Sequence, residues 1–204
     1  MKILLLISLA FMTCLGIFSM LSFTNKEVVT QTNILPLNTE SINNASVDYN
    51  SFKKLTNDLE LYRISRRVGV EGFLAKSKDA NTIILDTRSA EAYKQIHVKG
   101  AVHLNFSDFT KDKLAQVIPS QDTRILIYCN NNFRSPSFAL ALKAPALALN
   151  IPTFINLYEY GYEDIYELGP SLPVDGTILE FEGEDIQIVN AISPLLLKDL
   201  QAAK

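Results

Sequence analysis

The sequence has few of the residues on which several protein classes depend. Only 2 cysteines and 2 histidines occur in 204 residues, so a disulfide-rich scaffold is excluded and no metal site is expected. Glycine and proline number 8 each, too few for a collagen-like or low-complexity chain. The net charge is −3 and long basic runs are missing, so we expect no nucleic-acid partner. With 48% hydrophobic residues, the chain can bury a core.

A long apolar segment stands at the start of the chain. Ile3 to Phe23 carries no charged residue, and a helix of that length spans about 30 Å, the thickness of a bilayer core. We expect residues 1–24 to be a signal peptide or an uncleaved membrane anchor, and both interpretations stay open. Lipidation of Cys14 is disfavoured by the residues before it. The rest of the chain is therefore expected to be exported, either periplasmic or membrane-anchored and facing away from the cytosol.

Composition divides the remainder into three segments. Residues 25–50 are rich in Asn, Thr and Ser and show no period of 2 or 3.6, which is typical of a flexible tether. Residues 51–175 have the texture of a globular domain. Residues 176–204 form a C-terminal extension to which we assign no role.

The globular segment alternates apolar bursts with helical patterns, which predicts an α/β fold with a mostly parallel central sheet flanked by helices. Shorter elements are also expected: helices within 51–67 and at 71–76, a strand at 178–181 and a helix from Pro194. The main strands are predicted at 82–86, 100–104, 124–128 and 153–157, and the main helices at 89–95, 111–117, 135–150 and 162–168, with Pro145 kinking or breaking the third.

One cysteine follows directly after a predicted buried strand. Cys129 opens a short loop that ends at Arg134 and leads into the helix predicted from Ser135. Backbone N–H groups at a helix N-terminus, together with an arginine, favour a negative charge and would stabilise a thiolate. A cysteine at a strand end is more often a buried structural residue. The Cys-x4-Arg spacing shifts the interpretation toward function.

Five pieces of the chain, in the right order, resemble the motifs of a rhodanese-like domain, the single-domain sulfurtransferase family. The resemblance runs from about Val70 to Val174 and covers about half of the chain. Its pieces are Asp86-Thr87-Arg88 with Glu91, Ile96 to Leu104, the loop from Cys129 to Arg134, Tyr160-Gly161, and Leu168-Gly169 through Pro173-Val174.

The resemblance implies roles for the residues of the cysteine loop and for several residues near it. Cys129 would attack a sulfane sulfur donor and carry the sulfur as a persulfide, and a thiol or another thiophilic acceptor would remove it. A small sulfur donor and a thiol acceptor are the implied partners, and no metal or organic cofactor is needed. His97 would be structural rather than a base. Asp86 and Arg88 would be structural residues near the site, and the substrate would be bound by Asn130, Asn131, Asn132, Phe133 and Arg134.

The sequence departs from the family pattern in two places. The loop interior lacks the further basic residues or glycine of many active members, and Tyr160 stands at the first closing glycine while the usual Trp is absent. Either the substrate differs from thiosulfate or the activity is weak. The alternative is a non-enzymatic interaction or sulfur-sensing module.

Two other chemistries fit the sequence less well. A phosphatase or arsenate reductase needs a Cys-x5-Arg loop, and this loop is one residue shorter. Thiol–disulfide exchange normally uses a second cysteine nearby, and Cys14 lies in the N-terminal apolar segment. An external thiol would have to resolve the disulfide.

Overall fold

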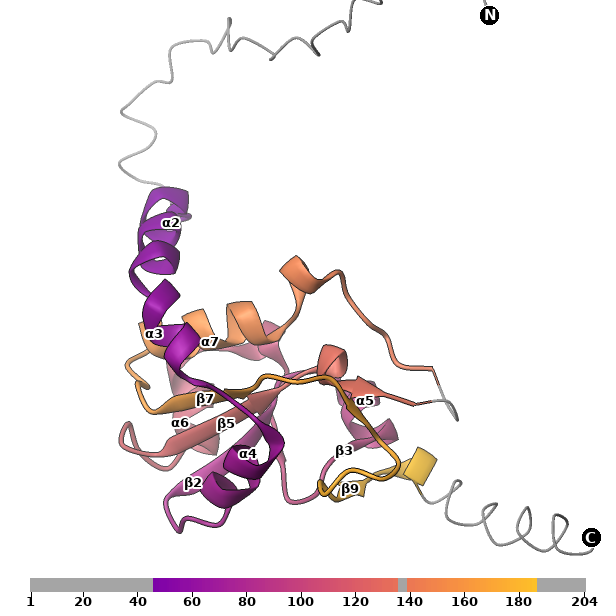
Figure 1. Ribbon diagram of the computed structural model, residues 1–204. Coiled ribbons are helices and arrows are strands. Elements are labelled where there is room, and N and C mark those ends of the chain that lie inside the picture. Colours follow the sequence, from indigo (N-terminus) through magenta and orange to yellow (C-terminus); the bar gives the residue numbers. More distant parts are fainter. Residues whose placement is uncertain (1–45, 136–138, 187–204) are drawn as a thin grey trace, which may run out of the picture. The chain divides into compact units, whose positions relative to one another are not determined.

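A parallel sheet organises the part of the chain that the structure describes, residues 46–135 and 139–186 of a computed structural model (Figure 1). The five strands run in the order β1-β7-β5-β2-β4, and every pairing between neighbours is parallel. The mostly parallel α/β sheet expected from the sequence is therefore confirmed. The strands are β1 (Arg67–Val68), β2 (Thr82–Asp86), β4 (Val102–His103), β5 (Arg124–Tyr128) and β7 (Ile165–Leu168).

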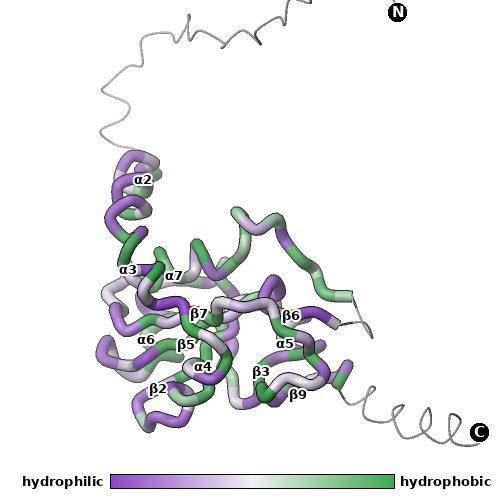
Figure 2. The backbone as a smooth tube through the Cα atoms, viewed as in Figure 1, coloured by the Kyte–Doolittle hydropathy of each residue, from purple (hydrophilic) through white to green (hydrophobic). Residues whose placement is uncertain are grey.

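The central strand β5 separates two apolar cores, because successive side chains of a strand point to opposite faces. Ile125 and Ile127 belong to one core, with residues of α6 (Lys111–Val117) and α7 (Asn150–Glu159). Leu126 and Tyr128 belong to the other, with Phe73 of α4 (Val70–Ser77). Hydrophobic residues accordingly concentrate in the strands and on α4 (Figure 2). The end of β5 is thus held rigidly from both faces.

The remaining elements are short and surround this frame. Helices α2 (Tyr49–Asp58) and α3 (Glu60–Ser65) precede β1, and α2 contains no buried residue. A second sheet pairs β3 with β9 in antiparallel fashion, and a third pairs β6 with β8 in parallel. The other elements are α5 (Ala90–Gln95), β3 (His97–Val98), η1 (Phe106–Asp108), η2 (Asn130–Asn132), β6 (Phe133–Arg134), η3 (Pro145–Leu147), β8 (Leu172–Pro173) and β9 (Phe181–Glu182).

The prediction of a helix at 135–150 is wrong. Residues 139–144 are not helical, a short 3-10 turn covers Pro145–Leu147, and α7 begins only at Asn150. The reason lies in the preceding loop. The Asn131 side chain donates to the backbone oxygen of Lys143 at 2.6 Å and accepts from its backbone N–H at 3.1 Å, so these backbone groups are bonded outside a helix.

Two further element predictions are wrong because tertiary packing overrides local preference. Residues 153–157, predicted as a strand, lie within α7, where Phe154 and Leu157 are spaced by one helical turn and both reach the sheet core. Residues 162–168, predicted as a helix, contain β7, which pairs with β1 and β5. The expected strand at 178–181 lies slightly later, as β9.

Several predictions fall outside the described residues: the leader, nearly all of the tether and the helix from Pro194. Helix α2 begins at Tyr49, inside the range assigned to the tether. Within residues 46–135 and 139–186, no helix combines the length and apolar character needed to cross a bilayer.

Candidate active site

The sulfur of the candidate site stands where the central strand ends. Cys129 follows β5 directly and caps the 3-10 turn η2, after which the chain leaves as β6. The residue is a free cysteine with 2% of its surface exposed. Since β5 has a neighbour on each side, the position of Cys129 is determined by the sheet rather than by a free loop.

Asn132 closes the cysteine loop from within. Its Oδ1 accepts hydrogen bonds from the backbone N–H of Cys129 at 2.9 Å and from Nδ2 of Asn150 at 3.0 Å. Its Nδ2 donates to the backbone oxygens of Leu168 at 2.7 Å and Pro170 at 3.1 Å. This buried amide ties the loop to α7 and to the end of β7.

The other two asparagines hold the segment that follows. Nδ2 of Asn130 donates to the backbone oxygen of Ala141 at 3.0 Å. The side chain of Asn131 donates to the backbone oxygen of Lys143 and accepts from its backbone N–H. Residues 141–143 therefore lie against the loop. Lys143 is brought to the site by this contact of its backbone and not by proximity in sequence.

A buried ion pair supports the loop from the neighbouring strand. Nη2 of Arg88 donates to Oδ2 of Asp86 at 2.6 Å, and Nη1 donates to Oδ1 of Asn130 at 2.7 Å. Burial opposes the charge of Arg88, but Asp86 outweighs it, and the pKa of Arg88 is raised. The hydroxyl of Tyr128 also donates to Asp86, and burial raises the pKa of Tyr128 well above its ordinary value. Arg88 thus stays charged and is held between Asp86 and Asn130.

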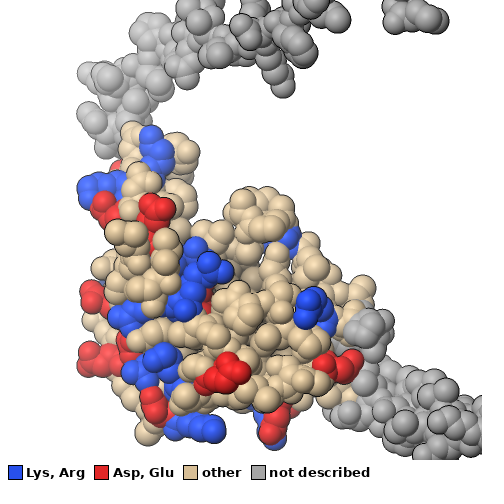
Figure 3. Space-filling view, in the orientation of Figure 1, with Lys and Arg blue, Asp and Glu red and all other residues tan. Residues whose placement is uncertain are grey.

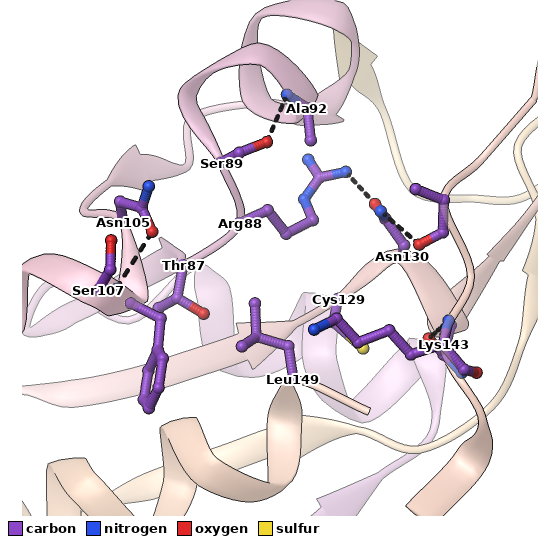
Figure 4. Close-up of a pocket in the computed structure, with 13 residues that line it drawn as sticks. Thr87, Arg88, Ser89, Ala92, Asn105, Ser107, Cys129, Asn130, Lys143 and Leu149 are labelled. Atoms are coloured by element: carbon purple, nitrogen blue, oxygen red, sulfur yellow. Dashed lines mark hydrogen bonds between the residues drawn. The ribbon is translucent and has the colours of Figure 1, made fainter. Parts of the chain in front are cut away.

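A cavity of about 360 Å³ opens beside Cys129 (Figure 4). Arg88 reaches it from the end of β2 and Lys143 from the segment after the loop, and Thr87 and Leu149 lie near the cysteine. A second cavity, of about 380 Å³, is lined by Cys129 and Asn131 as well, but otherwise by different residues. The first cavity has as its wall Thr87, Arg88, Ser89, Ala92, Asn105, Phe106, Ser107, Cys129, Asn130, Asn131, Ala141, Lys143 and Leu149.

The structure brings together only part of the predicted set. Asn130 and Asn131 line the first cavity with Cys129, and Asn131 and Asn132 line the second. Phe133 is buried against Tyr128 and Phe181, and Arg134 is exposed on β6; neither lines the two cavities.

The electrostatics of the site also differ from the expectation. Because the helix predicted from Ser135 does not form, no helix N-terminus of that kind faces Cys129 among the described residues. The nearby cations are instead Arg88 and Lys143 in the first cavity and Arg63 and Arg67 in the second. The sequence carried no signal for the last three, since Lys143 lay in a predicted helix and the two arginines precede the resembling segment.

Residues 70–168 match the family model of the rhodanese-like domain, and this part of the chain is a member of that family. Among solved structures, the rhodanese-like domain of the Alr3790 protein from Anabaena sp. is similar, with 18% identity, a TM-score of 0.43 and coverage of 59% of this chain and 81% of that chain. The BH2092 protein from Bacillus halodurans is 17% identical, with a TM-score of 0.40 and coverage of 58% and 77%.

A third similar structure is described as a rhodanese with anions from E. coli. It is 19% identical and has a TM-score of 0.35, and the match covers 50% of this chain and 99% of that chain. A search of curated proteins found no match. The family of residues 70–168 agrees with the resemblance noted in the sequence and supports a domain of the sulfurtransferase type.

Proposed function

We propose that this domain is a sulfurtransferase in which Cys129 carries sulfane sulfur as a persulfide. The observation that carries the proposal is the position of Cys129, at the end of the central strand of a rhodanese-like domain and in the wall of two cavities. Lys143 in the first cavity suits the anionic end of a donor such as thiosulfate, whereas the charge of Arg88 is neutralised by Asp86.

The loading step balances without a cofactor. The thiolate sulfur of Cys129 attacks the outer sulfur of thiosulfate and forms a new S–S bond. The bond between the two sulfurs of thiosulfate breaks, and its electron pair leaves with sulfite. The sulfur stays on Cys129 as a persulfide until a thiophilic acceptor removes it and regenerates the thiolate.

Intact mass spectrometry tests the proposal. The full chain is incubated with thiosulfate or inorganic polysulfide, desalted and weighed, with Cys129→Ser as the matched control. We expect a gain of about 32 Da, one sulfur, in the wild type that is reversed by a reducing thiol and does not form in the control. An unchanged mass with every donor would overturn the proposal.

A non-enzymatic interaction or sulfur-sensing module is the second candidate. The observation that favours it is the enclosure of the loop: Cys129 is 2% exposed, and the side chains of all three loop asparagines are already hydrogen-bonded within the protein. An interaction module would show no turnover, and Cys129→Ser would leave its cellular phenotype unchanged. A sulfur-sensing module would also show no turnover, but Cys129→Ser would abolish its response.

We also propose that the domain works outside the cytosol, on the strength of the apolar run from Ile3 to Phe23. Cell fractionation of the full chain, with intact mass of the recovered protein, tests this. A cytosolic protein that keeps its N-terminal residues would contradict it.

A further inference from the structure

The second cavity beside Cys129 has a charge arrangement of its own. It is lined by residues of α3, β1, α7 and the end of β7, and two of its residues, Arg63 and Arg67, precede the segment that matches the family model. Figure 3 shows basic side chains gathered over α3. Its wall consists of Arg63, Arg67, Cys129, Asn131, Asn132, Pro145, Ala148, Asn150, Ile151, Glu167, Leu168 and Gly169.

Two arginines share one buried carboxylate in this wall. Nη2 of Arg63 donates to both oxygens of Glu167, at 2.9 and 2.7 Å, and Nε of Arg67 lies 3.0 Å from Oε1. Two guanidinium groups against one carboxylate leave a net charge of +1. Because Glu167 is buried and contacts both arginines, the excess positive charge lies at the cavity when Glu167 is ionised. It suits a ligand with a single negative charge.

Two buried polar atoms of the same wall have no partner among the described residues. One is a donor, Nε of Arg63, and the other an acceptor, Oδ1 of Asn150. Asn150 is 7% exposed, and its Nδ2 is used by Asn132. Buried polar groups are nearly always hydrogen-bonded, so a ligand that offers both an anionic oxygen and an N–H group would satisfy this wall.

We infer that the second cavity binds the sulfur acceptor, and that this acceptor is a small thiol with a carboxylate and an N–H group, as in an amino-acid or peptide thiol. Arg63 and Arg67 bind the carboxylate, and Asn150 accepts from the N–H group. Thiosulfate lacks the N–H group and carries two negative charges, so it fits the wall less well. The inference rests on the proposed persulfide function and adds the acceptor class to it.

The transfer step balances as the reverse of loading. The acceptor thiolate attacks the outer sulfur of the Cys129 persulfide, and a new S–S bond forms between acceptor and transferred sulfur. The bond from the transferred sulfur to Sγ of Cys129 breaks, and its electron pair stays on Sγ. The product is the acceptor persulfide and a regenerated thiolate, with no external oxidant or reductant.

A single-turnover experiment on the full chain tests the inference. The protein is loaded with thiosulfate and desalted, and the loss of the added sulfur is followed by mass after mixing with cysteine, with glutathione, or with cysteine methyl ester or glutathione diethyl ester, which lack free carboxylates. Rates are expressed per thiolate concentration. We expect Arg67→Gln to lower the preference for the free acid over the ester by about tenfold, the value of a lost charge-assisted contact.

Arg66→Gln is the matched control, because Arg66 pairs with Asp164 and lines neither cavity. Arg63→Lys, which keeps the charge, provides a second variant with a smaller expected loss. An equal effect of Arg66→Gln, no preference for the free acid in the wild type, or an equally slowed loading step would each overturn the inference. A wild-type protein that never loads would instead refute the proposed function itself, and the acceptor site with it.

Comparing cysteine with glutathione distinguishes an amino-acid thiol from a peptide thiol as the preferred sulfur acceptor. A larger effect of Arg67→Gln with glutathione identifies a peptide thiol as the preferred acceptor, and a larger effect with cysteine identifies an amino-acid thiol. Either result supports a carboxylate subsite at Arg63 and Arg67.

Discussion

The amide oxygen of Asn132 accepts a hydrogen bond from the backbone N–H of Cys129 at 2.9 Å. The side chain of the loop's last asparagine thus occupies a backbone donor at the candidate nucleophile. With its bonds to Asn150, Leu168 and Pro170, Asn132 acts as the central link of the loop. We therefore expect the main role of Asn132 to be holding the conformation of the loop, and not contacting the substrate.

Asn132→Ala should therefore destabilise the protein. The substitution leaves several buried polar groups without a partner, and we expect a loss of about 2–4 kcal/mol in the free energy of unfolding. Urea denaturation measures it. Asn131→Ala is the control, since its hydrogen bonds to Lys143 are exposed, and its cost should stay below about 1 kcal/mol. Equal losses for the two variants would contradict the central role of Asn132.

The two basic residues near the loop should differ in their effect on an anionic donor. Lys143 lines the cavity beside Cys129, whereas Arg134 is exposed on β6 and does not. We expect Lys143→Gln to raise the thiosulfate concentration needed for half-maximal loading several-fold, and Arg134→Gln to change it little. Loading followed by intact mass at varied thiosulfate provides the measurement. The opposite order would support the substrate-binding role that the sequence predicts for Arg134.

Glu167 should give the stability of the protein a pH dependence. Burial raises the pKa of this carboxyl above its ordinary value of 4.5, although Arg63 and Arg67 lower it in part. Since the folded protein holds this proton more tightly than the unfolded chain, the contribution of Glu167 is complete below pH 4.5 and is lost as the pH rises through the raised pKa.

Glu167→Gln keeps the protonated shape and removes this dependence. We expect the variant to gain stability relative to the wild type between about pH 4 and pH 7. Urea unfolding of both proteins across this range measures the difference, and other groups cancel in the comparison. A difference that is constant with pH, or that moves in the wild type's favour as pH rises, would refute the raised pKa.

The strand β9 should be part of the folded domain. Phe181 packs edge-on against Phe133, with ring centroids 5.0 Å apart, and β9 pairs with β3. Phe181→Ala should cost about 1–3 kcal/mol, less than for a fully buried ring. Ile178→Ala, at an exposed position of the same segment, should leave the melting temperature unchanged. Thermal unfolding compares the two, and a neutral Phe181→Ala would place β9 outside the cooperative unit.

The elements that the sequence predicted well are those whose local pattern and tertiary role agree. The β-branched bursts at 82–86 and 124–128 became β2 and β5, and the capped segments at 89–95 and 111–117 became α5 and α6. The errors cluster between 135 and 168. There, the predicted strand at 153–157 lies within α7 and the predicted helix at 162–168 contains β7, because tertiary burial decided the outcome and local preference did not.

The candidate site divides in the same way. Cys129 at a strand end follows from residue types at short spacing along the chain, and the family resemblance added the expectation of structural roles for Asp86 and Arg88 near the site. The positions of Lys143, Arg63 and Arg67 could not be found by spacing, since they reach the two cavities from a hydrogen-bonded segment, from α3 and from β1.

Local sequence was thus sufficient for a mostly parallel α/β sheet, the strand at 124–128 and the cysteine that follows it, since alternation and β-branched runs are properties of neighbouring residues. The charges around that cysteine depended on the tertiary structure. Asn131 bonds to Lys143 across twelve positions, and Glu167 draws in Arg63 from more than a hundred positions away. Such long-range pairings form only when the sheet brings distant segments together.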